Sequence, residues 1–170
     1  MFDSHVLGVD PGTGSVGLAV VDRGKGRPVV SWAATLSTPA AAPPEERLQR
    51  IHMVVTELLS EHCPEALAIE RLLWGRNAGS AMHVARASGV VMLAAAQAGV
   101  PVFEYAPLEV KMAVTGVGNA SKEQVRRGLG LMLGASHVPA QPDAADAVAV
   151  ALCHLQQAPI RRLERAEAGR

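Results

Sequence analysis

The opening of the chain reads as three short apolar strands joined by tight turns, and this pattern restricts the fold more than any other. The predicted strands run from His5 to Asp10, from Val16 to Asp22 and from Pro28 to Ser37. The link from Pro11 to Ser15 contains a proline and two glycines, which favour reverse turns. Strands joined by such short links pair in opposite directions, so the chain should begin with an antiparallel meander.

Helices and strands alternate after the meander. Apolar residues recur at helical spacing from Glu45 to His62, whereas Ala66 to Glu70 is a short apolar run typical of a buried strand. The remaining predicted elements are a helix from Gly79 to Ala98, a strand from Val100 to Tyr105, a helix begun by the capping pair Ser121 and Gln124, and a helix from Pro142 to about Gln157. Such alternation implies parallel crossover connections. The expected fold class is α/β, with a mixed five-stranded sheet and flanking helices.

Length and composition fit one domain. A chain of 170 residues with 49% hydrophobic residues can bury a sizeable core. We expect one domain over residues 1–158 and a charged, mobile tail over residues 159–170. No signal peptide and no uninterrupted apolar run of membrane-spanning length is present, which predicts a soluble, cytoplasmic protein without a membrane partner. Basic and acidic residues number 16 each, so net charge neither indicates nor excludes a nucleic-acid partner.

Four carboxylates stand where this fold would bring them together. Asp10 and Glu70 each end a predicted strand, and these two strands should lie side by side and parallel. Ligand sites of open α/β sheets lie at the carboxyl ends of such strands. Asp143 and Asp146 are three residues apart in the first turns of the last helix, so they share one helix face. If that face packs toward the sheet edge, all four acids converge.

A cluster of this kind calls for a cation. Two like charges about 4 Å apart repel by roughly 4 kcal/mol at an effective dielectric constant of about 20. Oxygen ligands without cysteine or histidine favour Mg²⁺ or Mn²⁺ over zinc. Two such ions would activate a water and stabilise the leaving oxygen of a phosphodiester. The sequence therefore predicts a two-metal phosphodiesterase site.

Each acid also has a simpler structural explanation. The helix dipole favours Asp143 in a first turn, and Asp10 before Pro-Gly is typical of a turn. Glu70 is harder to explain this way, because it ends an apolar run and should be partly buried. The four acids taken together favour the metal site.

Several spaced motifs resemble those of the RuvC-type Holliday-junction resolvases. They are Gly-Val-Asp10-Pro-Gly, Ala-Ile-Glu70, Phe103-Glu-Tyr and Asp143-Ala-Ala-Asp146-Ala, and the resemblance extends from Leu7 to Leu155. It implies a ribonuclease H-like fold and a homodimer that nicks four-way DNA junctions symmetrically with Mg²⁺ or Mn²⁺ during recombination and repair. It also implies cooperation with a branch-migration motor of the RuvA and RuvB type.

The resemblance assigns roles to individual residues. The catalytic, metal-binding acids fall on Asp10, Glu70, Asp143 and Asp146, although some members have histidine at the position of Asp143. The basic residues that support phosphate contact and catalysis match Lys111 and Lys122. Either lysine has the alternative of an ordinary solvated surface charge.

The loop after Glu70 is expected to contact DNA. In familiar members an aromatic residue of this loop stacks at the junction centre, and the aligned position here is Leu73, followed by Trp74. An indole can stack on any base, so whether Leu73 or Trp74 enters the junction stays open. The expected DNA-binding residues of this loop are Arg71, Leu73, Trp74, Arg76 and Asn77.

The helix from Gly79 to Ala98 has few polar side chains and cannot present a wide polar face to water. We expect it to form a two-fold interface, which would place two active sites on one particle. The alternative is a helix buried within its own domain.

Three other functions are compatible with parts of the pattern. Asp10-Pro-Gly-Thr-Gly-Ser is similar to the phosphate loop of actin-like ATPases, but those proteins need a second domain. A related resolvase-like family that processes ribosomal RNA shares the Asp-Pro-Gly opening, so a nuclease acting on RNA is one alternative. A non-catalytic junction-binding module is the other, although a decayed site should have lost at least one carboxylate.

Overall fold

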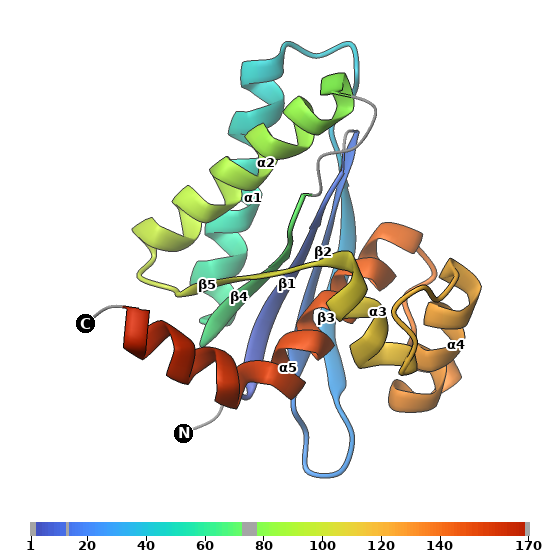
Figure 1. The fold of residues 1–170 in the computed structure, drawn as a ribbon. Coiled ribbons are helices and arrows are strands. Elements are labelled where there is room, and N and C mark those ends of the chain that lie inside the picture. The colour runs from blue at the N-terminus through green and yellow to red at the C-terminus, as the bar shows by residue number, and fades with distance from the viewer. Residues whose placement is uncertain (1–2, 13, 73–77, 169–170) are drawn as a thin grey trace.

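The computed structural model describes residues 3–12, 14–72 and 78–168. Within them, five strands form one mixed sheet in the order β3-β2-β1-β4-β5 (Figure 1). The strands are β1 (His5–Pro11), β2 (Ser15–Asp22), β3 (Val29–Ser37), β4 (Ala66–Glu70) and β5 (Val102–Tyr105). β1 to β3 pair antiparallel, and β4 and β5 extend the sheet in parallel from β1. The predicted meander with parallel crossovers is confirmed.

Helices cover both faces of this sheet (Figure 1). They are α1 (Pro44–His62), α2 (Ala78–Gln97), α3 (Pro107–Thr115), α4 (Lys122–Leu133) and α5 (Pro142–Ala168). α1 and α2 share one hydrophobic core with the sheet, and α3, α4 and α5 share the other. α5 lies directly on β1 and β2, the middle of the sheet.

The alternation of side chains along β1 decides which face receives Asp10. Leu7 and Val9 pack in the core under α1 and α2, whereas Val6 packs in the core under α5. Because successive strand residues point to opposite faces, Gly8 and Asp10 share the α5 face with Val6. The first catalytic candidate therefore points toward the last helix.

Two glycines let α5 lie unusually close to the sheet. A Cβ atom on Gly8 would lie 2.2 Å from the carbonyl oxygen of Ala147, and one on Gly17 would lie 1.9 Å from that of Asp143. Both distances are far below van der Waals contact, so no larger residue fits at either position without moving the helix. This close approach brings the start of α5 to the sheet edge where β1 ends.

The structure adds a helix that the sequence analysis did not predict. α3 follows β5 directly, in a segment expected to be a connection before Ser121. Its start and end have recognisable signals, with Pro107 in the first turn and Gly116 in a left-handed conformation at φ 74°. Those signals enclose only nine residues, too few for a hydrophobic periodicity to stand out.

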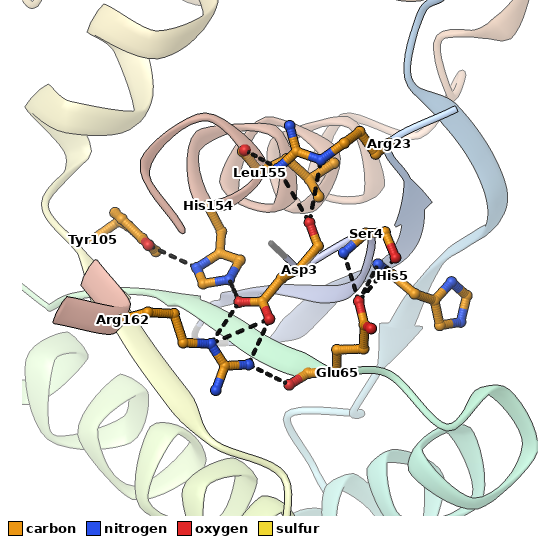
Figure 2. Close-up of polar contacts among 9 residues, drawn as sticks. All are labelled: Asp3, Ser4, His5, Arg23, Glu65, Tyr105, His154, Leu155 and Arg162. Atoms are coloured by element: carbon orange, nitrogen blue, oxygen red, sulfur yellow. Dashed lines mark hydrogen bonds and ion pairs between the residues drawn. The ribbon is translucent and has the colours of Figure 1, made fainter. Parts of the chain in front are cut away.

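The structure also corrects the end of the last helix. The expected end was about Gln157, but α5 continues through Pro159 to Ala168. Proline has no N–H to donate to the carbonyl of Leu155 four residues earlier. The Nη2 of Arg23 donates to that oxygen instead, at 2.5 Å (Figure 2). The side chain of Arg23, the residue after β2, thus replaces the hydrogen bond that the helix loses at Pro159.

None of the helices in the described part of the chain combines the length and apolar character needed to cross a lipid bilayer.

Candidate active site

Asp10 and Glu70 lie at adjacent strand ends. β1 and β4 pair in parallel with Val9 opposite Ile69, so the next residue of each strand is one of the two acids. Glu70 shares a strand face with Ala68, which packs in the core under α5. Both carboxylates are half-buried and face α5. The pairing of the two strands and the alternation of their side chains are therefore sufficient to place Asp10 beside Glu70.

α5 supplies the other two acids, and β2 holds one of them. Asp143 and Asp146 lie in the first turns of the helix, both half-buried. The hydroxyl of Ser15 donates a hydrogen bond to Asp143 Oδ2 at 2.6 Å. Sequence reasoning missed Ser15, because a serine beside a glycine turn gives no sign of a partner 128 residues away. The start of α5 is therefore tied to the sheet next to Asp10.

One cavity brings together three of the predicted acids and both predicted lysines. It has a volume of about 330 Å³ and is lined by Asp10, Glu70, Pro107, Val110, Lys111, Lys122, Val125, Asp146 and Ala149. Asp143 lies outside this lining, beside Ser15. The contributing elements are β1, β4, α3, α4 and α5, so residues from the whole length of the chain meet here.

Burial, and then mutual repulsion, oppose the ionisation of the carboxylates. Burial raises the pKa of Asp10 to about 7, and the charges of Glu70, Asp146 and Asp143 contribute further, with Lys122 acting in the opposite direction. Burial and Asp146 raise the pKa of Glu70 in the same way, against Lys111 and Lys122. The arrangement stores repulsion that a bound cation would relieve.

The two lysines reach the cavity from separate helices. Lys122 opens α4 directly after Ser121, whose hydroxyl accepts from the Gln124 N–H while the Gln124 side chain accepts from the Ser121 N–H. The Nζ of Lys122 lies 3.5 Å from Asp146 Oδ2, and its side chain is 87% exposed. Such an exposed ion pair contributes little stability, so the ammonium group is free to address a ligand. Lys111 reaches the same cavity from α3.

The donor set suits a hard divalent cation. All four acids offer carboxylate oxygens, and neither cysteine nor histidine lines the cavity. Oxygen-only ligands favour Mg²⁺ or Mn²⁺. In the described part of the chain, no three acidic, histidine or cysteine side chains already form a group able to hold a metal ion.

A second cavity of about 270 Å³ adjoins the same two strand ends. Asp10 and Glu70 line it together with Arg71, and its other lining residues are Pro11, Leu72, Val84 and Pro107. Arg71, predicted to contact DNA, is exposed at this position, and its N–H donates to the carbonyl of Tyr105 at 2.7 Å. The other predicted DNA-binding residues of the loop, Leu73, Trp74, Arg76 and Asn77, lie outside the described residues.

Comparisons with known proteins identify the family of this chain and confirm its fold. The family described as "Crossover junction endodeoxyribonuclease RuvC" matches residues 6–154. A crossover junction endodeoxyribonuclease RuvC of Moorella thermoacetica is 44% identical over 97% of this chain and 99% of its own. The structure of Thermus thermophilus RuvC is similar with a TM-score of 0.84 and 39% identity, covering 92% of this chain and 96% of that one.

A second structure of the Thermus thermophilus protein, in complex with a Holliday junction substrate, has a TM-score of 0.86 and 38% identity, with 93% of this chain and 96% of that one covered. The ribonuclease H-like fold predicted from the sequence is confirmed by these structures. Family match, full-length identity and shared fold lead to one assignment. The chain belongs to the RuvC family of crossover junction endodeoxyribonucleases.

Proposed function

We propose that this protein resolves four-way DNA junctions by paired, symmetric nicks during homologous recombination and DNA repair. The observation that supports this most directly is the shared cavity, in which Asp10, Glu70 and Asp146 lie with Lys111 and Lys122. Acids that hold cations and lysines that bind phosphate are the two requirements of metal-dependent phosphodiester hydrolysis. The similar Thermus thermophilus protein was solved with a Holliday junction substrate, which supplies the substrate class.

The RuvC family is metal-dependent, and we assign the ions of this protein to its four acids. Asp10, Glu70, Asp143 and Asp146 would together hold two Mg²⁺ or Mn²⁺ ions. When bound, the ions supply an activated water and neutralise charge at the leaving oxygen. Ser15 keeps Asp143 at the start of α5 in position for this task.

The basic side chains have the task of placing the DNA. Lys111 and Lys122 would hold the scissile phosphate and its neighbour against the carboxylates. Arg71 lines the adjoining cavity and would contact the opened crossover. We assign the same task to Leu73, Trp74, Arg76 and Asn77, which lie outside the described residues. Phosphate contacts of this kind depend on charge rather than on base sequence, so they suit a substrate recognised by its shape.

The test is nicking of a synthetic mobile four-way junction, beside a linear duplex and an RNA–DNA hybrid, with Mg²⁺, with Mn²⁺ or with EDTA. The parent protein should make paired nicks only on the junction and only with metal. Asp146→Asn should abolish cleavage and retain junction binding, because binding rests on phosphate contacts and shape. Preferred cleavage of the hybrid would instead show an RNA-directed nuclease, and tight binding without any cleavage would show a non-catalytic module.

A homodimer is the second part of the proposal, and α2 is its proposed interface. One face of α2 packs in the core through Ala87, Val91 and Ala94. The other face exposes Met82 and Leu93, at 47% and 52% of their surface. These two residues lie on one stripe of the helix together with Arg86 and Gly89, which are also exposed. An exposed apolar stripe on a helix of low polarity supports a two-fold contact.

Sedimentation of a charged variant tests this interface. Leu93→Glu should convert a dimer to a monomer and abolish paired nicking, since a buried, unpaired charge is costly. Leu131→Glu is the control, because Leu131 is 84% exposed on α4, on the opposite face of the sheet. A dimer that survives Leu93→Glu would remove α2 from the interface.

Two further assignments follow from the family and the substrate. We propose that a branch-migration motor of the RuvA and RuvB type cooperates with this protein, and stimulation of cleavage by such a complex would test it. We also propose that the protein works in the cytoplasm of a bacterial cell, where chromosomal junctions form, and fractionation of cells would check this.

A further inference from the structure

The orientation of α3 decides where the ammonium group of Lys111 lies. α3 is a nine-residue helix that begins two residues after the end of β5. It packs against α4 and α5, and Lys111 extends from it into the active-site cavity. α3 buries Val110 and Val114 in the core, and specific polar contacts add to what fixes its rotation about its own axis.

The C-terminal half of α5 provides polar contacts to α3 and to the strand before it. The hydroxyl of Tyr105, the last residue of β5, is 2.7 Å from His154 Nδ1 in a fully buried contact (Figure 2). Farther along α5, the Nε2 of Gln156 donates to the carbonyl of Ala113 at 3.1 Å. These two contacts hold both ends of the α3 region against α5.

A third contact acts on the helix beside the lysine. Arg161 Nη2 donates to Glu109 Oε1 at 2.5 Å, and the Arg161 guanidinium also lies over the ring of Tyr105, 5.2 Å from its centroid. The other carboxylate oxygen, Glu109 Oε2, accepts from the N–H of Ala106 at 2.7 Å. One side chain therefore caps the start of α3 and ties the helix to α5.

Glu109 and Lys111 point to different sides of α3. Two residues correspond to about 200° around a helix axis, so a helix held at Glu109 directs Lys111 away from the Arg161 contact. That opposite side is the one lined by Asp10, Glu70 and Asp146. The side chains of Arg161 and Glu109 are only 28% and 29% exposed, which makes this pair stronger than an ordinary surface ion pair.

We propose that Arg161 is a positioning residue for catalysis, which through Glu109 fixes the rotation of α3 and thereby aims Lys111 at the scissile phosphate. The proposal rests on the proposed function, in which Lys111 contacts that phosphate. It gives a role to Arg161, in the part of α5 that follows Pro159, which the sequence pattern did not suggest.

The next residue of α5 provides a matched control. Arg162 also forms an ion pair, but its Nε donates to Asp3 Oδ2 at 3.0 Å, at the start of the chain and away from α3 (Figure 2). Loss of Arg162 removes an ion pair of the same helix turn and leaves the pair between Arg161 and Glu109 intact. Arg161→Gln therefore removes a contact of α5 with α3, whereas Arg162→Gln removes a contact of α5 with the start of the chain.

The experiment measures single-turnover cleavage of a four-way junction by saturating protein, together with junction affinity in EDTA and the melting temperature. Arg161→Gln and Glu109→Gln should each slow cleavage by about 10-fold at unchanged affinity, since a small misplacement of a catalytic group has that cost. Glu109→Gln keeps an oxygen for the Ala106 N–H and removes only the charge. Arg162→Gln should lower the melting temperature and cleave at the parent rate.

A double variant distinguishes aiming from general support. If Arg161 acts through Lys111, then Arg161→Gln should not slow a Lys111→Ala protein further. Equal slowing in both backgrounds, or equal slowing by Arg161→Gln and Arg162→Gln, would overturn the proposal. A Lys111→Ala protein that cleaves at the parent rate would overturn it as well, by removing the group to be aimed.

Amide hydrogen exchange gives a readout that does not need activity. In the metal-free protein, exchange over residues 107–115 should become faster in Arg161→Gln and stay unchanged in Arg162→Gln, because only the first releases α3. Unchanged exchange in both variants would overturn the proposal. A parent protein that cleaves no junction would refute the proposed function alone, and exchange would still decide whether Arg161 holds α3.

Discussion

Asp10 is the active-site residue whose placement lowers the stability of the metal-free fold the most clearly. In the metal-free protein its pKa is raised to about 7 by burial and by the neighbouring acids. The folded state then keeps a proton that the unfolded chain has lost above its ordinary pKa of 3.8. Stability therefore falls as the pH rises from about 4 to about 7, the reverse of a carboxylate in an ion pair.

Asp10→Asn should remove this cost. In EDTA at pH 8 the variant should be more stable than the parent by about 2 to 4 kcal/mol, and the difference should shrink toward pH 4. Urea unfolding at several pH values measures it. Mn²⁺ should stabilise the parent and have little effect on the variant, and a variant no more stable than the parent at pH 8 would contradict the electrostatic argument.

Ser15 tests whether the placement of Asp143 matters. Ser15→Ala removes the hydrogen bond to Asp143 Oδ2 and should cost about 1 kcal/mol of stability. Cleavage should slow and should recover at higher Mn²⁺ concentration, because only the preorganisation of a metal ligand is lost. Ser31→Ala is the control, since the Ser31 hydroxyl bonds the carbonyl of Val20 away from the site. Equal effects of the two variants on cleavage would show that Ser15 does not position Asp143 for catalysis.

Residue types at strand ends were sufficient to predict the acids, but not their partners. Asp10 and Glu70 lie at the ends of apolar strands, and a charge that ends a buried run, as Glu70 does, has few structural explanations. The hydrogen bond from Ser15 had no comparable signal, because a hydroxyl is acceptable in any turn. The roles of the acids, of Lys111 and of Lys122 stay predictions that the variants above address.

At the scale of elements, the close contact between α5 and the sheet sets the geometry of the site. Gly8→Ala would place a methyl group 2.2 Å from the carbonyl of Ala147. The helix must shift, which should cost about 3 kcal/mol and should slow cleavage, because Asp146 is carried along. Gly26→Ala is the control, since a Cβ atom there meets nothing within 4 Å. Thermal unfolding and cleavage rates report the two effects, and a Gly8→Ala protein as stable as the control would refute them.

Periodicity predicted the long elements and failed for two helical segments. α3 is too short to show a repeating apolar face, and its start and end signals enclose only nine residues. α5 continues beyond Pro159 because Arg23, far away in sequence, supplies the hydrogen-bond donor that proline lacks. A local rule about proline cannot include such a partner. Both segments take part in the contact between Arg161 and Glu109.

At the scale of the molecule, a buried polar network joins the beginning of the chain to α5. His154 is fully buried between Asp3 and Tyr105, and Arg162 pairs with Asp3 (Figure 2). A neutral imidazole satisfies every partner, because Nε2–H donates to Asp3 and Nδ1 accepts from the Tyr105 hydroxyl. Burial lowers the pKa of His154 despite the nearby Asp3 carboxylate.

This network should make the fold sensitive to mild acid. Below about pH 6.5 the unfolded chain takes up a proton on His154 that the folded state refuses, so stability should fall by roughly 1 kcal/mol per pH unit. The measurement is urea unfolding between pH 7.5 and 5 in the Asp10→Asn background, which removes the opposing contribution of Asp10. His154→Gln should flatten the curve, and an unchanged slope would assign the acid sensitivity to another group.

The position of α5 at the end of the chain also bears on synthesis in the cell. This helix covers the middle of the sheet and contributes Asp143 and Asp146, two of the four proposed metal ligands. A nascent chain that stops before residue 143 has half of those ligands and an uncovered sheet. With the proposed ligands, folding and nuclease activity would depend on the same late segment, and an incomplete translation product would lack both.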